Sequence, residues 1–169
     1  MQLDLTKVIR NPGESVDFEI NLEPDDLEFD QLVEYRGIPH AEGVISNTAG
    51  VVLLTGKLTA DTLCACDRCA SEFDKHIDLY LEAVLSNDES EMEDPDIFPV
   101  EGESVDVDEI VRTLYMVSLD TKFLCKPDCK GLCGKCGKNL NEGPCNCTKE
   151  LDPRMAVLGQ LLDNKEQDS

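Results

Sequence analysis

Large aromatic side chains are scarce in this sequence. It contains no tryptophan, three tyrosines and five phenylalanines, so aromatics make up only 5% of its residues. Hydrophobic residues of all kinds still make up 41% of the 169 residues, which is enough to build the core of one ordinary domain. Aliphatic side chains must therefore supply most of the packing.

Positive charge is scarce as well. The chain has 15 lysines and arginines against 36 aspartates and glutamates, which gives a formal net charge of −21. Such a chain repels polyanions and anionic membrane surfaces at long range, and it favours a basic protein partner. The same charge also keeps a protein soluble, so the composition leaves both roles open.

Long apolar runs are missing too. The run Val51-Val52-Leu53-Leu54 is far too short to cross a bilayer, and the first residues lack the cationic and apolar stretches of a secretory signal. We therefore expect a cytoplasmic protein, in which thiols stay reduced. Its nine cysteines are then better explained as metal ligands than as disulfides, which could not use an odd number of them.

The first 85 residues have the patterning of β-strands. In residues 73–85 one parity is mainly apolar and the other is mainly polar, with Asp74, His76, Asp78 and Glu82, which predicts a strand with one buried face. Residues 51–60 predict a second strand, the turn formers of 47–50 precede it, and residues 16–22 predict an edge strand. We expect an α+β fold whose β part is an antiparallel meander or a partly closed barrel.

A strongly acidic stretch follows the strands. Residues 86–109 contain no lysine or arginine, and Pro95 and Pro99 interrupt them, which predicts a loop. The spacing of an EF-hand is absent, so we assign no metal to these acids. The predicted domains are a β-rich region over 1–85, an acidic loop over 86–105, and a helical and zinc-binding region over 106–169 that packs on the β-region.

Two helices are predicted in this last region. Asp106 and Glu109 form a capping-box-like pair at the start of the first helix. Its apolar stripe consists of Val107, Ile110, Val111, Leu114 and Val117. A short C-terminal helix is expected to begin at Asp152-Pro153, because proline is favoured at the first helical position.

Four cysteines have the form of a zinc knuckle. Cys133 and Cys136 are two residues apart, so their thiolates can reach one tetrahedral ion, and Gly137 allows the positive φ that turns N–H groups towards sulfur. Cys145 and Cys147 follow after a stretch of turn formers. Four thiolates close the coordination shell of zinc, which predicts a structural and not a catalytic site.

Two more cysteine pairs lie upstream of the knuckle. Cys66 and Cys69 are again two residues apart at a turn between strands, and Cys125 and Cys129 follow the first predicted helix. Together they would bind a second zinc ion with four thiolates. The spacing alone leaves the number of ions at one or two, because Cys129 could also replace Cys145 in the knuckle.

The cysteine-rich region is locally basic. Between residues 122 and 149 there are six lysines and two acids, a surplus of four positive charges. The lysines are Lys122, Lys126, Lys130, Lys135, Lys138 and Lys149. They offset the net charge of −2 on zinc with four thiolates, but they could equally contact RNA, as knuckles elsewhere do.

Several of these segments together resemble one known family. The string from Cys125 to Asn141 reads CKPDCKGLCGKCGKNLN, and CDRC at 66–69, CNC at 145–147 and LDPR at 151–154 accompany it. They resemble the bacterial and plastid branch of the YceD family, whose members are linked to accumulation of large-subunit ribosomal RNA. The resemblance spans most of the chain and implies a role in ribosome assembly, without an established biochemical mechanism.

The resemblance also bears on the grouping of the cysteines. Some branches of the family lack the knuckle cysteines, keep the first pair, and carry a His and a Cys near the positions of Cys125 and Cys129. The resemblance therefore implies that Cys66 and Cys69 share a site with Cys125 and Cys129.

Catalytic signatures are weak by comparison. His40-Ala41-Glu42 fits the H-x-E of zinc deaminases, but 144–147 is one residue short of their second motif and Glu42 has a poor helical context. We expect His40 in a surface loop, His76 on a polar strand face, and Cys64 as a free buried thiol. Phosphate-binding glycine loops are also absent from the sequence.

The sequence therefore favours a protein that is not an enzyme. The leading hypothesis is a zinc-binding factor in ribosome assembly that holds a basic ribosomal protein. The alternative is direct RNA binding through the lysines of the knuckle. The sequence names neither the partner, nor the assembly step, nor the oligomeric state.

Overall fold

The computed structural model describes residues 1–87 and 97–147 of the chain. The chain divides into two compact units, residues 1–129 and residues 130–169. The helix predicted from Asp152 lies outside the described residues.

All the regular secondary structure of the described residues lies in the first unit. Its elements are β1 (Gln2–Asp4), α1 (Thr6–Arg10), β2 (Ser15–Asn21), the 3-10 helix η1 (Pro24–Leu27), β3 (Leu32–Tyr35), β4 (His40–Thr48), β5 (Val51–Ala65), β6 (Glu72–Ser86), β7 (Ile97–Pro99), β8 (Ser104–Asp106) and α2 (Val107–Ser118).

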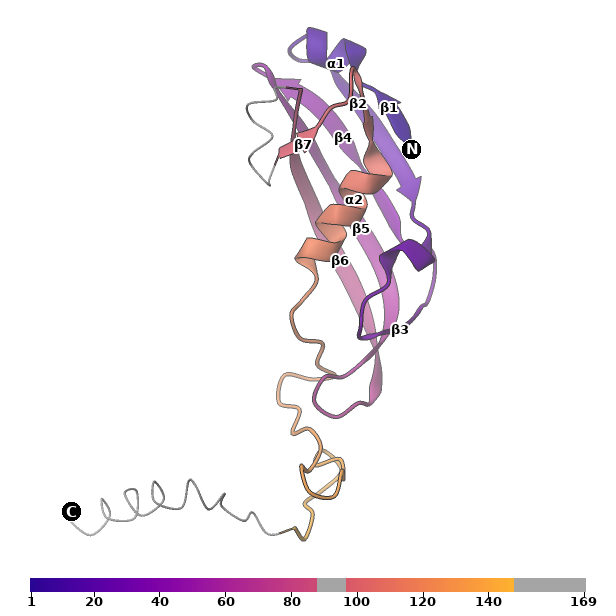
Figure 1. The fold of residues 1–169 in the computed structure, drawn as a ribbon, viewed down its shortest axis with the longest axis vertical. Coiled ribbons are helices and arrows are strands. Elements are labelled where there is room, and N and C mark those ends of the chain that lie inside the picture. The colour runs from indigo at the N-terminus through magenta and orange to yellow at the C-terminus, as the bar shows by residue number, and fades with distance from the viewer. Residues whose placement is uncertain (88–96, 148–169) are drawn as a thin grey trace, which may run out of the picture. The chain divides into compact units, whose positions relative to one another are not determined.

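Six of the strands form one open sheet (Figure 1). Its order is β2-β4-β5-β6-β7, and β3 pairs with the far end of β5. The segment β4-β5-β6 is the predicted antiparallel meander, whereas β6 and β7 pair in parallel. Of the two predicted alternatives the meander is the one that forms: the sheet does not close into a barrel, because β2 and β7 remain its two ends and do not pair with each other.

The long hairpin of β5 and β6 dominates the sheet. Each strand has 15 residues, and their register runs from Val52 opposite Leu85 to Ala65 opposite Glu72. The predicted alternation is confirmed in β6, where Leu81, Ala83 and Leu85 are buried and the residues between them are more exposed. The strand predicted to end at residue 60 continues to residue 65, because residues 62 and 64 extend its buried face.

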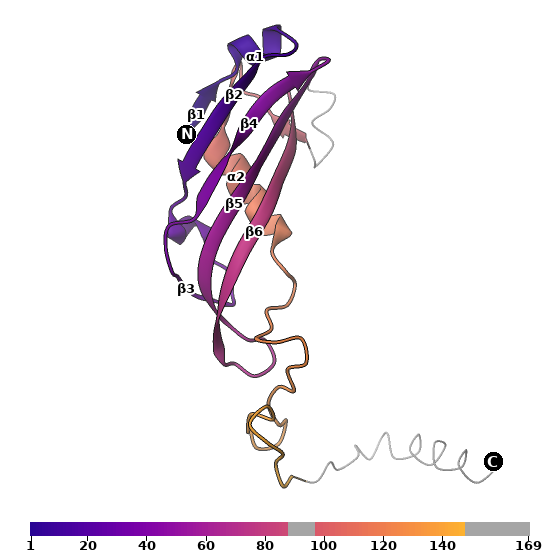
Figure 2. The ribbon, with the colours of Figure 1, turned by 180° about the vertical axis from the view of Figure 1, so that it is seen from behind.

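Helix α2 lies across one face of this sheet (Figure 1), and Figure 2 shows the opposite face in front of it. Its buried residues are Val107, Ile110, Val111 and Tyr115. The prediction that Val117 belongs to this stripe is wrong, since its side chain is 74% exposed. Tyr115 belongs to the buried stripe in its place, because a residue four positions after Val111 lies on the same side of a helix.

The buried tyrosine has a polar partner in the core. The hydroxyl of Tyr115 lies 3.0 Å from that of Tyr35, which donates a hydrogen bond of 2.8 Å to the carbonyl of Leu27. Burial raises the pKa of both tyrosines, so both hydroxyls stay protonated in the fold. This pair connects α2 to β3 and η1.

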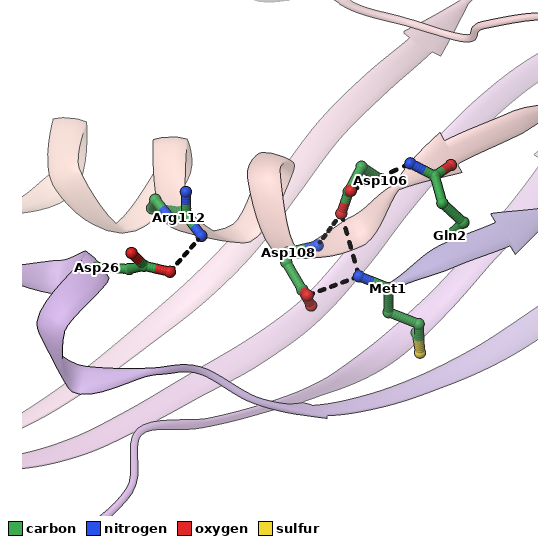
Figure 3. Close-up of polar contacts among 6 residues, drawn as sticks. All are labelled: Met1, Gln2, Asp26, Asp106, Asp108 and Arg112. Carbon is green, nitrogen blue, oxygen red and sulfur yellow. Dashed lines mark hydrogen bonds and ion pairs between the residues drawn. The ribbon is translucent and has the colours of Figure 1, made fainter.

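Hydrogen bonds and ion pairs of two aspartates stabilise the start of α2 (Figure 3). Asp106 caps it as predicted, since its Oδ1 accepts the N–H of Asp108 at 3.1 Å. The amino group of Met1 donates to both carboxylates, at 3.2 Å to Asp106 and 2.6 Å to Asp108. Burial opposes ionisation of Asp106, but the hydrogen bond from Met1 contributes to a lowered pKa. Farther along the helix, Arg112 bonds Asp26 of η1 at 2.8 Å.

The predicted acidic loop contains two strands. β7 adds to the sheet, and β8 pairs with β1 in a separate two-stranded sheet. Val100 and Val105 anchor this part in the core. Residues 88–96 lie outside the described part of the chain, and the three-part domain division stays a prediction.

Candidate metal centres

The first cysteine pair lies in the turn between β5 and β6. The N–H of Cys66 donates to Ser71 O at 3.0 Å, and the N–H of Ala70 donates to Cys66 O at 2.8 Å. Ala70 adopts a φ of 56°, a left-handed conformation that non-glycine residues use in tight turns. The turn thereby presents Cys66 and Cys69 together at the end of the hairpin.

The second pair lies in the segment that follows α2, and Phe123 attaches this segment to the hairpin. Its ring is buried and stacks on Phe29 with 5.0 Å between the ring centroids. The N–H of Asp67 donates to Phe123 O at 2.9 Å, and the N–H of Phe123 donates to Asp67 Oδ2 at 2.6 Å. Arg68 adds a hydrogen bond of 3.0 Å to Cys129 O. We call these contacts of Asp67, Arg68 and Phe123 the turn clamp.

The clamp brings four thiols together, which we call the hairpin site: Cys66, Cys69, Cys125 and Cys129. All four sulfurs lie within 4.8 Å of one another, with 3.8 Å between Cys66 and Cys129 and 3.7 Å between Cys69 and Cys125. A disulfide would need about 2.05 Å. A tetrahedral ion with metal–sulfur bonds of about 2.3 Å separates its ligands by about 3.8 Å, which fits these distances.

The thiols of the hairpin site differ in acidity. Burial opposes ionisation of Cys66, but the N–H groups of Cys125, Arg68 and Cys69 outweigh it and lower its pKa to about 6. Burial and hydrogen bonds with the other thiols raise the pKa of Cys125 to about 12. One thiolate therefore forms readily and a second is resisted, so all four thiols would ionise together only beside a cation that offsets their charge.

The second unit contains the knuckle cysteines, which we call the C-terminal site: Cys133, Cys136, Cys145 and Cys147. Their sulfurs also lie within 4.8 Å of one another. Gly137 has the predicted positive φ, at 70°, and its N–H donates to Cys133 O at 2.9 Å. The N–H of Cys133 in turn donates to Lys138 O at 2.9 Å, which closes the first half of the site.

Asparagines hold the second half of this unit in place. Leu132 and Asn139 form an isolated β-bridge, and Asn141 Oδ1 accepts the N–H of Lys130 at 2.9 Å. The Nζ of Lys138 donates to Pro144 O at 3.0 Å, directly before Cys145. The turn formers predicted between the two cysteine pairs therefore lie where the chain reverses.

The acidity pattern of the hairpin site recurs here. The N–H groups of Cys136 and Lys135 lower the pKa of Cys133 to about 6. A hydrogen bond with Cys136 is the larger cause, and burial the smaller one, that raise the pKa of Cys147 to about 12. The four thiols again need a cation to ionise together, so each of the two clusters could hold a metal ion.

The remaining candidate residues belong to neither cluster. Cys64 is fully buried, as predicted, and its sulfur lies 3.3 Å from Thr62 Oγ1. His76 lies on the exposed face of β6, as predicted, 2.7 Å from Asp61. His40 was expected in a loop, which is wrong, because it begins β4 and contacts Asn21 at 3.1 Å.

Sequence reasoning did not find the turn clamp. Asp67 and Phe123 are 56 positions apart, and they meet through the backbone of Phe123 and through the backbone and carboxylate of Asp67, which leave no periodic signal. The only available sign was the position of Asp67 and Arg68 between two cysteines.

Comparison with known proteins identifies the class of this chain. The model for the family described as large ribosomal RNA subunit accumulation protein YceD matches residues 54–162, a range that includes both candidate sites. The chain therefore belongs to the YceD family.

This chain is similar to individual relatives over only part of their length. An uncharacterized protein of Mycobacterium bovis is 31% identical over 116 residues, 66% of this chain and 56% of that protein. A protein of Arabidopsis thaliana named large ribosomal RNA subunit accumulation protein YCED homolog 1, chloroplastic, is 36% identical over 71 residues, 41% of this chain and 22% of that protein. This chain thus spans about half the length of the mycobacterial relative and less of the plastid one. No solved structure matches.

Proposed function

We propose that this protein is a zinc-binding, non-enzymatic factor that supports accumulation of the large ribosomal RNA subunit and ribosome assembly. The observation that carries the proposal is a pair of four-thiol clusters in a chain of the YceD family. Two plastid relatives, from Arabidopsis thaliana and Zea mays, are named for large ribosomal RNA subunit accumulation. The proposal extends that role to this chain.

The donor set supports zinc at both sites. Four thiolates in tetrahedral arrangement suit zinc or iron–sulfur chemistry, and the sulfur separations of 3.7 and 3.8 Å in the hairpin site fit a single zinc ion. Four protein ligands leave no open coordination position for a substrate or an activated water. Both ions would therefore be structural, which supports a binding factor in place of an enzyme.

The charge of the chain supports a basic protein as partner. At a net charge of −21, the chain attracts basic ribosomal proteins, and the attraction accelerates their encounter. Exposed charges are screened by salt, so the binding should weaken as ionic strength rises. Among the described residues, neither α-helix has the length and apolar character that crossing a bilayer requires.

The test is recovery of partners by the zinc-loaded full chain at low and high salt. We expect a basic ribosomal protein or a precursor particle at low salt and less of it at high salt. Cells lacking the protein should also hold a lower ratio of large-subunit to small-subunit ribosomal RNA. Recovery of neither partner at either salt, with an unchanged RNA ratio, would refute the proposal.

Direct RNA binding by the second unit is the other candidate. Lys130, Lys135 and Lys138 are exposed beside the C-terminal site. Filter binding with large-subunit RNA fragments would show affinity that is lost when these three lysines are changed to glutamate. The matched control changes Lys7, an exposed lysine of the first unit, and should leave RNA binding unchanged. Absence of binding to any fragment would end this candidate.

A further inference from the structure

Strand β6 has one edge that no other described strand covers over residues 76–83. On one side it pairs with β5 along its length, and on the other it pairs with β7 only at residues 84–86. No other described strand pairs with it. Within the described part of the chain, no strand therefore pairs with the N–H and C=O groups on this edge of residues 76–83, and such an edge can pair with another extended chain.

A cavity of about 220 Å³ opens beside this edge. It is lined by five consecutive residues of β6, Lys75 to Leu79, and by Tyr115, Ser118, Leu119, Asp120 and Phe123. Neighbouring side chains of a strand point to opposite faces of a sheet. A cavity that touches five consecutive residues must therefore reach the edge of the strand itself, where backbone atoms contribute.

The two sides of this edge differ in character. Inside the cavity, Ile77, Leu79 and Leu119 are only partly buried, so the cavity offers apolar surface to a side chain. On the outer face, Asp78 and Glu82 are exposed.

The charges around the edge are mainly negative. Asp78 pairs with Lys57 at 3.1 Å, whereas Glu82 has no ion pair with any described residue. The inward-facing Lys75 is neutralised by Asp120 and lies over the Phe123 ring, 4.4 Å from its centroid. On the outer side of the edge, Asp78 is thus offset by Lys57, and Glu82 supplies an excess negative charge that favours lysine and arginine.

We propose that the edge of β6 binds an extended segment of a basic protein as an additional strand. Main-chain hydrogen bonds to residues 76–83 hold the segment, as in other cases of strand addition. One of its apolar side chains enters the cavity, and its alternate lysines or arginines face Asp78 and Glu82. The inference rests on the proposed function, for which it supplies the binding surface.

A second copy of this chain is a poorer occupant than a basic segment. Two chains with a net charge of −21 each repel one another, and the acids beside the edge would face acids. A basic segment would form the same backbone hydrogen bonds, and its positive charges would be attracted to the acids beside the edge. The proposal therefore commits to a basic segment.

The probe is a synthetic peptide of alternating lysine and valine, added to the zinc-loaded, isotope-labelled full chain. Two control peptides carry N-methyl groups, one on the lysines and one on the valines. Strand addition uses the N–H groups of only one alternate set. We expect amide shifts and slowed hydrogen exchange at residues 76–83, and one methylated peptide that binds roughly tenfold more weakly than the other.

A pair of protein variants tests the charge contribution. Asp78→Asn with Glu82→Gln should weaken binding of the unmodified peptide several-fold at low salt. Asp25→Asn with Glu28→Gln removes the same charge from exposed acids around η1 and should leave binding unchanged. Circular dichroism of both variants establishes that they are folded.

Three results would overturn the inference: equal binding of all three peptides, amide shifts away from residues 76–83, or no binding at all. Formation of a dimer through β6, seen by sedimentation without peptide, would overturn the choice of occupant. None of these results would prevent recovery of ribosomal partners by the full chain. Failure of this inference is therefore distinguishable from failure of the proposed function.

Discussion

The two candidate metal sites have the same ligands in different surroundings. In the hairpin site, three of four cysteines are buried, and the turn clamp and the stacked Phe29 and Phe123 position them. In the C-terminal site, Cys136 is exposed and the other three cysteines are half-buried. No described residue between 130 and 147 belongs to the buried hydrophobic core.

If both sites hold a metal ion, the same set of four thiols has two different structural roles. The hairpin site joins segments that the core already brings close to each other. With a metal ion bound, the C-terminal site would take the place of a core for residues 130–147, none of which belongs to the buried hydrophobic core. Metal loss should therefore affect the two units unequally.

Removal of metal is expected to have the largest effect. A strong chelator should abolish amide protection throughout residues 130–147, because metal binding supplies about 10 kcal/mol or more of folding free energy in small zinc peptides. The strands of the first unit should keep most of their protection. Hydrogen exchange with mass spectrometry, run with and without chelator, measures both. Equal loss in the two units, or no loss in residues 130–147, would contradict the comparison.

Single cysteine changes separate the two sites. Cys133→Ser should release one ion and unfold residues 130–147 while leaving the first unit unchanged. Cys66→Ser should release the other ion and raise exchange in the β5–β6 turn and in residues 123–129, while the C-terminal site keeps its metal. Elemental analysis and native mass spectrometry count the ions. Cys64→Ser is the control and should release no ion, since the thiol of Cys64 lies outside both sites. Loss of both ions from Cys133→Ser or from Cys66→Ser would show that the sites depend on each other.

Truncation of Phe123 tests the part of the hairpin site that does not depend on metal. Phe123→Ala removes a buried ring and its stacking on Phe29, which should lower the free energy of unfolding of the first unit by about 3 to 5 kcal/mol. Denaturant unfolding measures this loss. Val117→Ala, at a 74% exposed position of α2, should change stability by less than about 0.5 kcal/mol. If Phe123→Ala keeps its free energy of unfolding but loses metal from the hairpin site more easily, the ring stabilises the site and not the core.

The smallest effect is expected away from both sites. Tyr115→Phe removes the hydroxyl that lies 3.0 Å from Tyr35, which should lower the free energy of unfolding by about 1 kcal/mol and leave both ions bound. Tyr80→Phe, at a 66% exposed position, should leave stability unchanged. Thermal unfolding and metal content measure the two quantities. Metal loss from Tyr115→Phe would mean that the core and the hairpin site are coupled more closely than the contacts indicate.

Local patterns were sufficient to predict the meander of the sheet. Strict alternation in β6 and the turn formers before Val51 report directly on strands and hairpins. The cap at Asp106 was predictable for the same reason, because one residue type at one position determines it. The parallel pairing of β7 was not predictable, since it depends on how the chain returns after β6.

The grouping of the cysteines could not be decided by spacing. Cys129 is four residues from Cys125 and four from Cys133, so the sequence alone allowed it in either site. What brings Cys129 into the hairpin site is the turn clamp, including the bond from Arg68 to its carbonyl. Such contacts between residues far apart in the sequence depend on the finished fold.

The same clamp has a consequence for the order in which the protein assembles. Ligands of the hairpin site are 56 to 63 positions apart, so that site cannot form until β5, β6 and α2 have been made and packed. The C-terminal site closes within residues 133–147 and needs no distant segment. During synthesis, a metal ion at the C-terminal site would therefore bind as a local event. An ion at the hairpin site would bind only after the hairpin has folded, and its presence would report that the first unit has folded.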